Sequence, residues 1–120
     1  MTNAYQVAQR VVGQSIDVDG FPPGQPYQCV DLVNWVAQQF GGSLLGNGNQ
    51  IGIGNDVSSF ADVIPYSNES QLKVGDIIST NEPSTPYGHT LVYGGGGVNN
   101  ARVIEQNFNG ITHVIEQTRT

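Results

Sequence analysis

Cys29 is the only cysteine in this 120-residue chain, and its partners in sequence suggest chemistry. A single thiol can form no internal disulfide and cannot by itself build a thiolate metal site. Downstream, His89 follows a glycine in one run of strand-forming residues, and Glu105 and Asn107 stand two apart in a later run. A thiol, an imidazole and an acidic or amide side chain are the groups that a cysteine hydrolase uses.

Cys29 stands at the predicted start of a helix, which suits a nucleophile. A helix N-terminus offers unpaired N–H groups and a partial positive charge, and both stabilise a thiolate. Beside an imidazolium, the pKa of a cysteine thiol can fall from ~8.5 to as low as ~3–4. The same N–H groups could bind a developing oxyanion. The alternative is that Cys29 is a small buried hydrophobe on the core face of its helix.

His89 and Glu105 are expected to meet if their strands are neighbours. Strand alternation projects Glu105 and Asn107 to one face, roughly 7 Å apart. Glu105 would then accept the proton of one imidazole nitrogen, while the other nitrogen addresses Cys29. Taken singly, each residue has a plainer role: a hydrogen-bonded sheet histidine, a solvated carboxylate and an amide leading into a turn. The second histidine, His113, is predicted to be a surface strand residue.

The helices that position these groups follow from the spacing of apolar residues. Between Cys29 and Phe40 apolar side chains recur at helical intervals, and Gly41-Gly42 ends that helix. A shorter helix is predicted over residues 3–12, with Asn3 able to cap it.

Beyond Leu72 the apolar period changes to that of strands. Strands are predicted at residues 76–80, 89–93, 100–108 and 111–118. Asn109-Gly110 is a strong signal for a two-residue hairpin turn between the last two. Helices followed by an antiparallel sheet predict a single α+β domain over residues 1–120.

Composition narrows the possible partners. The net charge is −6, and the four basic residues are scattered, so no cationic stripe exists for nucleic acid. No apolar stretch has the length of a membrane span, and none has the pattern of a signal peptide. We therefore expect neither nucleic acid nor a membrane as a partner.

Taken together, these motifs resemble the CHAP family, the cysteine, histidine-dependent amidohydrolase/peptidase domain. The resemblance lies in four stretches, which occur in the family's order: residues 27–35, 72–78, 88–93 and 103–107. It implies a papain-like fold, in which N-terminal helices, one of them carrying the nucleophile, pack on a C-terminal antiparallel sheet. It also implies that Cys29 is the nucleophile and His89 the general base. Glu105 would orient His89, and Asn107 would assist or replace Glu105.

The activity that the resemblance implies is hydrolysis of a peptidoglycan amide bond. An N-acetylmuramoyl-L-alanine amidase and a stem-peptide or cross-bridge endopeptidase both fit it. The chain looks most similar to CHAP domains of bacteriophage endolysins and tail-associated lysins. That similarity implies a phage-encoded, extracellular protein acting at the cell wall, either virion-associated or released at host lysis. It further implies a monomeric domain of a larger protein with separate targeting modules.

Three aspartates around the cysteine predict a structural calcium site. Asp17 and Asp19 lie in a glycine-bearing loop, Asp31 follows Cys29 by two residues, and hard cations prefer such oxygen ligands. The segment is similar to the calcium loop of some phage CHAP domains, which implies Asp17, Asp19, Asp31 and the backbone carbonyl of Phe21 as ligands. The alternative is an Asx-type turn at the first two aspartates, with Asp31 favouring the helix dipole.

The same residues fit two other functions. One is a catalytically silent calcium-binding or wall-binding module on the same fold. The other is a cysteine amidohydrolase of the NlpC/P60 type that acts on a different amide. The silent module predicts a missing catalytic group, whereas Cys29, His89 and Glu105 are all present.

Overall fold

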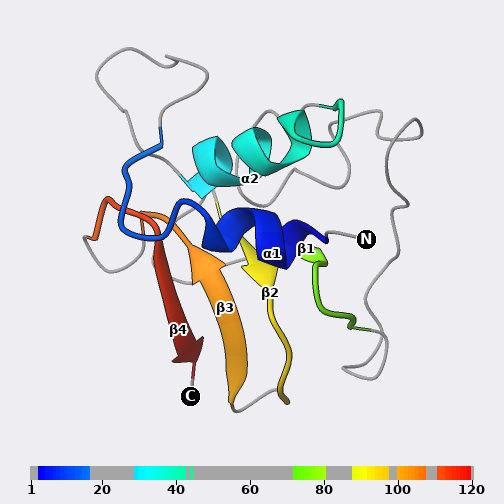
Figure 1. Cartoon of the computed structure of the whole chain (residues 1–120). Helices are drawn as coiled ribbons and strands as arrows, with labels where there is room; N and C mark the ends of the chain where they lie inside the picture. The colour runs from blue at the N-terminus through cyan, green and yellow to red at the C-terminus, as the bar shows by residue number, and fades with distance from the viewer. Residues whose placement is uncertain are drawn as a thin grey trace.

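The computed structural model describes residues 3–16, 29–42, 44, 72–80, 88–97, 100–107 and 111–119 (Figure 1). Its elements are, in chain order, α1 (Ala4–Gln9), α2 (Cys29–Gln38), β1 (Ile77–Thr80), β2 (His89–Tyr93), β3 (Ala101–Glu105) and β4 (Ile115–Arg119). In the described part of the chain two helices thus precede four strands, which confirms the predicted α+β fold.

The four strands form one antiparallel sheet in the order β1-β2-β3-β4, so each strand pairs with its neighbours in sequence. Both helices pack on this sheet, α2 against β2 and α1 against β2 and β3 (Figure 1). Neither helix in the described part of the chain is long and apolar enough to cross a membrane.

The helix α1 starts with a reciprocal cap. The Asn3 side chain accepts from the Gln6 N–H (2.9 Å), and the Gln6 side chain accepts from the Asn3 N–H (3.0 Å). The helix ends at Gln9, earlier than predicted, because the next turns close through tighter bonds such as Val11 N–H to the Ala8 carbonyl (3.1 Å). Residues 10–14 therefore form turns that return the chain toward β4.

The helix α2 carries the largest share of the core. Leu32, Val33 and Val36 on its apolar face are fully buried, as the helical spacing predicted. Burying each such side chain contributes about 1.5–3 kcal/mol. The helix ends at Gln38, and Phe40 lies beyond that end and is exposed. This core face fixes the orientation of α2 on β2 and so the place of its first residue, Cys29.

The link between β3 and β4 differs from the predicted hairpin. Glu105 pairs with Ile115, so β3 ends well before Asn109-Gly110, which lies outside the described residues. A two-residue turn there would instead have paired Glu105 with Val114. Val114 is fully buried, and its N–H and carbonyl bond to residues 13–14 at 2.8 Å each. Pairing with the turn after α1 removes Val114 from the ladder and shifts the register of β4 by one residue.

Candidate active site

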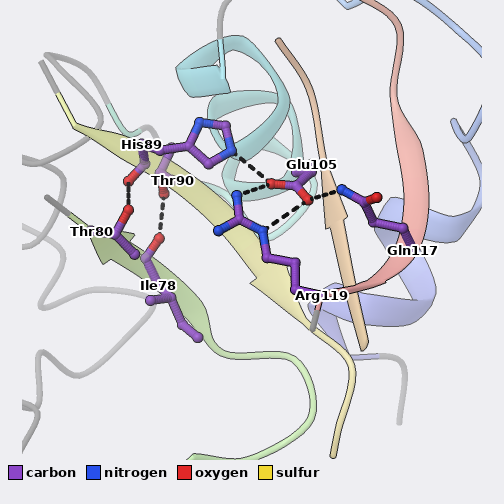
Figure 2. Close-up of polar contacts among 7 residues, drawn as sticks. All are labelled: Ile78, Thr80, His89, Thr90, Glu105, Gln117 and Arg119. Atoms are coloured by element: carbon purple, nitrogen blue, oxygen red, sulfur yellow. Dashed lines mark hydrogen bonds and ion pairs between the residues drawn. The ribbon is translucent and has the colours of Figure 1, made fainter. Parts of the chain in front are cut away.

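His89 is the first residue of β2 and faces the interior, with 4% of its surface exposed. The residue before it, Gly88, has a φ of 68°, which suits glycine. Two side chains tie this end of β2 to β1: Thr80 Oγ1 donates to the His89 carbonyl (3.3 Å), and Thr90 Oγ1 donates to the Ile78 carbonyl (2.8 Å) (Figure 2). The backbone of the histidine is therefore fixed from the edge strand.

Glu105 is the last residue of β3, and none of its surface is exposed. Its Oε1 lies 2.9 Å from Nε2 of His89, and Figure 2 shows the two side chains pointing at one another. Ile104 pairs with Val92, so continuing that register places Glu105 two residues diagonally from His89. A long side chain reaches such a diagonal neighbour in an antiparallel pair.

Cys29 approaches His89 from α2. It is the first residue of that helix, 9% exposed, and hydrogen-bonded to His89. Since Nε2 of His89 faces Glu105, Nδ1 is the ring nitrogen left for the sulfur. Cys29 also packs in the core cluster, so its burial and its contact with the imidazole occur together. The structure thus brings together three predicted residues from α2, β2 and β3.

The surroundings of His89 favour its charged form. Burial alone lowers its pKa, but the hydrogen bonds with Cys29 and Glu105 outweigh that effect and raise the pKa to about 9. The imidazole is therefore protonated at neutral pH. An imidazolium beside a thiol is the pairing that stabilises a thiolate nucleophile.

Glu105 is held in its charged form by three partners. Burial raises the pKa of this carboxyl, but bonds from His89, Arg119 and Gln117 outweigh burial and bring the pKa to about 2. The carboxylate is thus ionised at neutral pH, and both of its oxygens can accept hydrogen bonds.

Arg119 and Gln117 on β4 are site residues that the sequence analysis did not identify. Gln117 Nε2 donates to Glu105 Oε2 (2.6 Å). Arg119 donates with Nε to Oε2 (3.2 Å) and with Nη2 to Oε1 (2.6 Å), as Figure 2 shows. Their spacing of two residues puts both on one face of β4. That spacing is the only sign in the sequence that these two residues belong to the site. It points to Glu105 only once the register of β4 is known.

Asn107 lies just past the end of β3. Because β3 ends at Glu105, Asn107 sits on the following turn, exposed and in a left-handed conformation with a φ of 60°. Among the described residues, Glu105 rather than Asn107 hydrogen-bonds the imidazole. His113 is likewise exposed, on a bend before β4 rather than on a strand.

The predicted calcium ligands are only partly in view. Asp31 lies in the first turn of α2 and is fully buried. Asp17, Asp19 and Phe21 lie outside the described residues. Within the described part of the chain, no three histidine, cysteine or acidic side chains are grouped to hold a metal ion. The calcium site therefore stays a prediction.

In this α+β protein a cysteine on a helix hydrogen-bonds a histidine on the sheet, and that histidine bonds a carboxylate. The protein therefore has a Cys-His-Glu site. A family model of the CHAP domain matches residues 20–107, and the chain belongs to the CHAP domain family. That family is generally associated with peptidoglycan hydrolysis, and its members are typically cysteine- and histidine-dependent amidohydrolases.

A solved structure has a similar fold. The crystal structure of Ly7917 superposes with a TM-score of 0.69 at 14% sequence identity, over 98% of this chain and 55% of that one. The chain therefore spans about half the length of that protein, and at this identity the likeness concerns the fold alone. A search of curated proteins gives no significant match.

Proposed function

We propose that this chain is a peptidoglycan hydrolase that cleaves a cell-wall amide bond with Cys29 as nucleophile. The observation that carries the proposal is the hydrogen-bonded series Cys29–His89–Glu105, with 2.9 Å between the imidazole and the carboxylate. A cysteine on a helix and a histidine on an antiparallel sheet form a papain-like arrangement. The CHAP family membership supports the choice of peptidoglycan as substrate.

The reaction begins with attack of the Cys29 sulfur on the amide carbonyl carbon. The carbonyl oxygen becomes an oxyanion, which backbone N–H groups at the start of α2 are suited to bind. The C–N bond then breaks as the His89 imidazolium gives its proton to the departing amine. A thioester on Cys29 and a neutral imidazole remain.

Water completes the cycle. Neutral His89 takes a proton from water, the resulting hydroxide attacks the thioester, and the C–S bond breaks to release the carboxylic acid. The sulfur leaves with its electron pair, and His89 is again protonated. Throughout, Glu105 accepts the Nε2 proton and keeps Nδ1 directed at the sulfur. An N-acetylmuramoyl-L-alanine amidase and an endopeptidase would both use these steps.

The biological setting is part of the proposal. We place the chain in a phage-type lysin that acts on the wall from the virion or at host lysis. With a net charge of −6, the domain has no electrostatic attraction to an anionic wall. We therefore expect it to act as a monomeric catalytic module whose targeting is supplied by other modules.

A bound calcium ion would serve the same site. Carboxylate and carbonyl oxygens suit this ion, and Asp17, Asp19, Asp31 and the Phe21 carbonyl supply them. Asp31 is buried two residues after the nucleophile, so an ion held there would fix the preceding loop to the start of α2. Its contribution is structural, and the chemistry stays with Cys29 and His89.

The test is the analysis of muropeptides released from purified walls by the wild-type protein and by Cys29→Ala. We expect new termini from one amide bond with the wild type only, while circular dichroism shows the same fold for both. Mass spectrometry of the products also separates amidase from endopeptidase activity. Wall lysis by Cys29→Ala at the wild-type rate would refute the nucleophile. Slow alkylation of Cys29 near neutral pH would instead favour a silent module.

A further inference from the structure

The carboxylate of Glu105 receives more support than a hydrogen bond to His89 requires. It is fully buried, and both of its oxygens are occupied by side chains from β4. A buried carboxylate is unfavourable unless it is paired and hydrogen-bonded. Arg119 meets that need with two N–H groups, one to each oxygen, at 2.6 and 3.2 Å.

We propose that Arg119 is a positioning residue, which fixes the carboxylate of Glu105 and, through it, the imidazole of His89. The inference rests on the proposed function and adds to it a residue of the last strand. Arg119 and its neighbour Gln117 lie beyond residues 20–107, the part of the chain that the family model matches. The role is thus assigned by the geometry of this structure.

The two-point contact of Arg119 determines how Glu105 is oriented. A guanidinium presents Nε and Nη2 in one rigid plane, so bonding both carboxylate oxygens fixes the carboxylate plane. Gln117 adds a third bond, to Oε2 at 2.6 Å. With the carboxylate plane fixed by β4, Oε1 faces Nε2 of His89 while it also accepts from Arg119 Nη2.

Arg119 also supplies a charge that lasts through the reaction. When His89 has given its proton to the leaving amine, it is neutral and no longer a counter-ion for Glu105. The arginine remains charged at any working pH, so Glu105 keeps a cationic partner at that stage. The carboxylate then stays ionised and can keep accepting the Nε2 proton while Nδ1 takes a proton from water.

A second arginine in the same strand pair provides a matched control. Arg102 on β3 bonds Glu116 on β4 at 3.0 Å, but its side chain is 46% exposed, against 26% for Arg119. Exposed pairs of this kind contribute little to stability. Arg102→Ala therefore removes an arginine from the same ladder without touching the site.

The experiment compares wall-lysis kinetics of Arg119→Ala, Arg119→Lys and Arg102→Ala over a range of pH. For Arg119→Ala we expect the rate at saturating substrate to fall about 10- to 100-fold, with KM little changed. The rate of Arg119→Lys should fall less, because lysine keeps the positive charge and loses only the two-point contact of the guanidinium. Arg102→Ala should retain the wild-type rate. Added guanidinium ion should restore part of the activity of Arg119→Ala alone.

The pH profile separates positioning from a general loss of structure. The groups facing Glu105 are His89 from β2 and Gln117 and Arg119 from β4, with Cys29 on α2 beyond the imidazole. Without Arg119 the pKa of Glu105 rises, so the acid limb of the profile should move to higher pH. Circular dichroism over the same pH range identifies any loss of activity that comes from unfolding, and a shift of the acid limb in the folded variant reports positioning.

The outcomes also separate this inference from the proposed function. Lysis by Cys29→Ala would refute the proposed function whatever Arg119 does. If Cys29→Ala is inactive while Arg119→Ala and Arg119→Lys keep the wild-type rate and profile, the role of Arg119 is refuted. Should Arg119→Ala fail to fold, Arg119→Lys decides: an unchanged rate and acid limb overturn the inference.

Discussion

Gln106 holds both backbone groups of Ile16, a residue 90 positions earlier in the chain. Its Nε2 donates to the Ile16 carbonyl (2.9 Å), and its Oε1 accepts from the Ile16 N–H (2.8 Å). Both residues are buried. The contact joins the residue directly after Glu105 to the segment that leads into the predicted calcium loop. One amide therefore links the end of the β3 strand to the chain that precedes Cys29.

Replacing the Gln106 side chain should destabilise the folded protein. We expect Gln106→Ala to lower the free energy of unfolding by about 2–4 kcal/mol, because two buried backbone groups lose their partner. Gln9→Ala is the matched control, since that amide is exposed and lies 3.5 Å from Glu116. Urea denaturation of both variants measures the difference. A loss under ~0.5 kcal/mol for Gln106→Ala, the range of ordinary surface substitutions, would contradict the role of this contact.

Glu105 rather than Asn107 is expected to orient the imidazole. Glu105→Gln keeps the shape but removes the charge and can present a donor to Nε2. We therefore expect the rate of wall lysis to fall by about 100-fold or more, as wrong tautomers do in related triads. Asn107→Gly should change the rate less than about threefold, because Asn107 is exposed and glycine accepts its φ of 60°. Equal losses of rate in the two variants would show that Asn107 also acts in the site.

The parts of the site that the sequence predicted are those fixed by local periodicity. The helical spacing after Cys29 identified α2, and alternation identified β2 with His89 at its first residue. Glu105 was identified because it stands within one run of alternating residues. In each case the signal lies within a few turns or one strand, where side-chain period and burial agree.

The parts of the site that the sequence did not predict depend on contacts between segments that lie far apart in the chain. The turn signal at Asn109-Gly110 predicts a register in which Gln117 and Arg119 face away from Glu105. Pairing of Val114 with residues 13–14 shifts that register by one. A one-residue shift moves every side chain of a strand to its other face. The support that β4 gives Glu105 could therefore not be predicted from local pattern.

Removal of calcium should lower thermal stability. An ion that binds only the folded state stabilises it by about 2.7 kcal/mol at 100 times its Kd, which is on the order of 10 °C in melting temperature. We expect a chelator to lower the melting temperature by several degrees and added calcium to restore it. Asp17→Asn should abolish the response to calcium. An unchanged melting temperature of the wild-type protein in chelator would remove the ion from the proposal.

The pH dependence of stability should follow the two coupled side chains of the site. The pKa of His89 rises from 6.5 to about 9 on folding, so its contribution is complete below pH 6.5 and is lost as the pH rises through 9. The pKa of Glu105 falls from 4.5 to about 2, so its contribution is complete above pH 4.5 and is lost as the pH falls through 2. Urea denaturation across this range should therefore place the greatest stability, as far as this pair sets it, between about pH 4.5 and 6.5.

Wall-lysis activity should be lost at the same alkaline pH at which His89 stops contributing to stability. Above about pH 9 His89 loses the proton that the leaving amine needs, so the rate of wall lysis should fall there. In His113→Asn the imidazole of His89 is the last one in the chain, and NMR can follow its titration directly. Glu105→Gln in the same background should lower the pKa of His89, because the anion that favours the imidazolium is gone. Titration of His89 near pH 6.5 in the folded protein would show that the hydrogen bonds with Cys29 and Glu105 do not govern its charge.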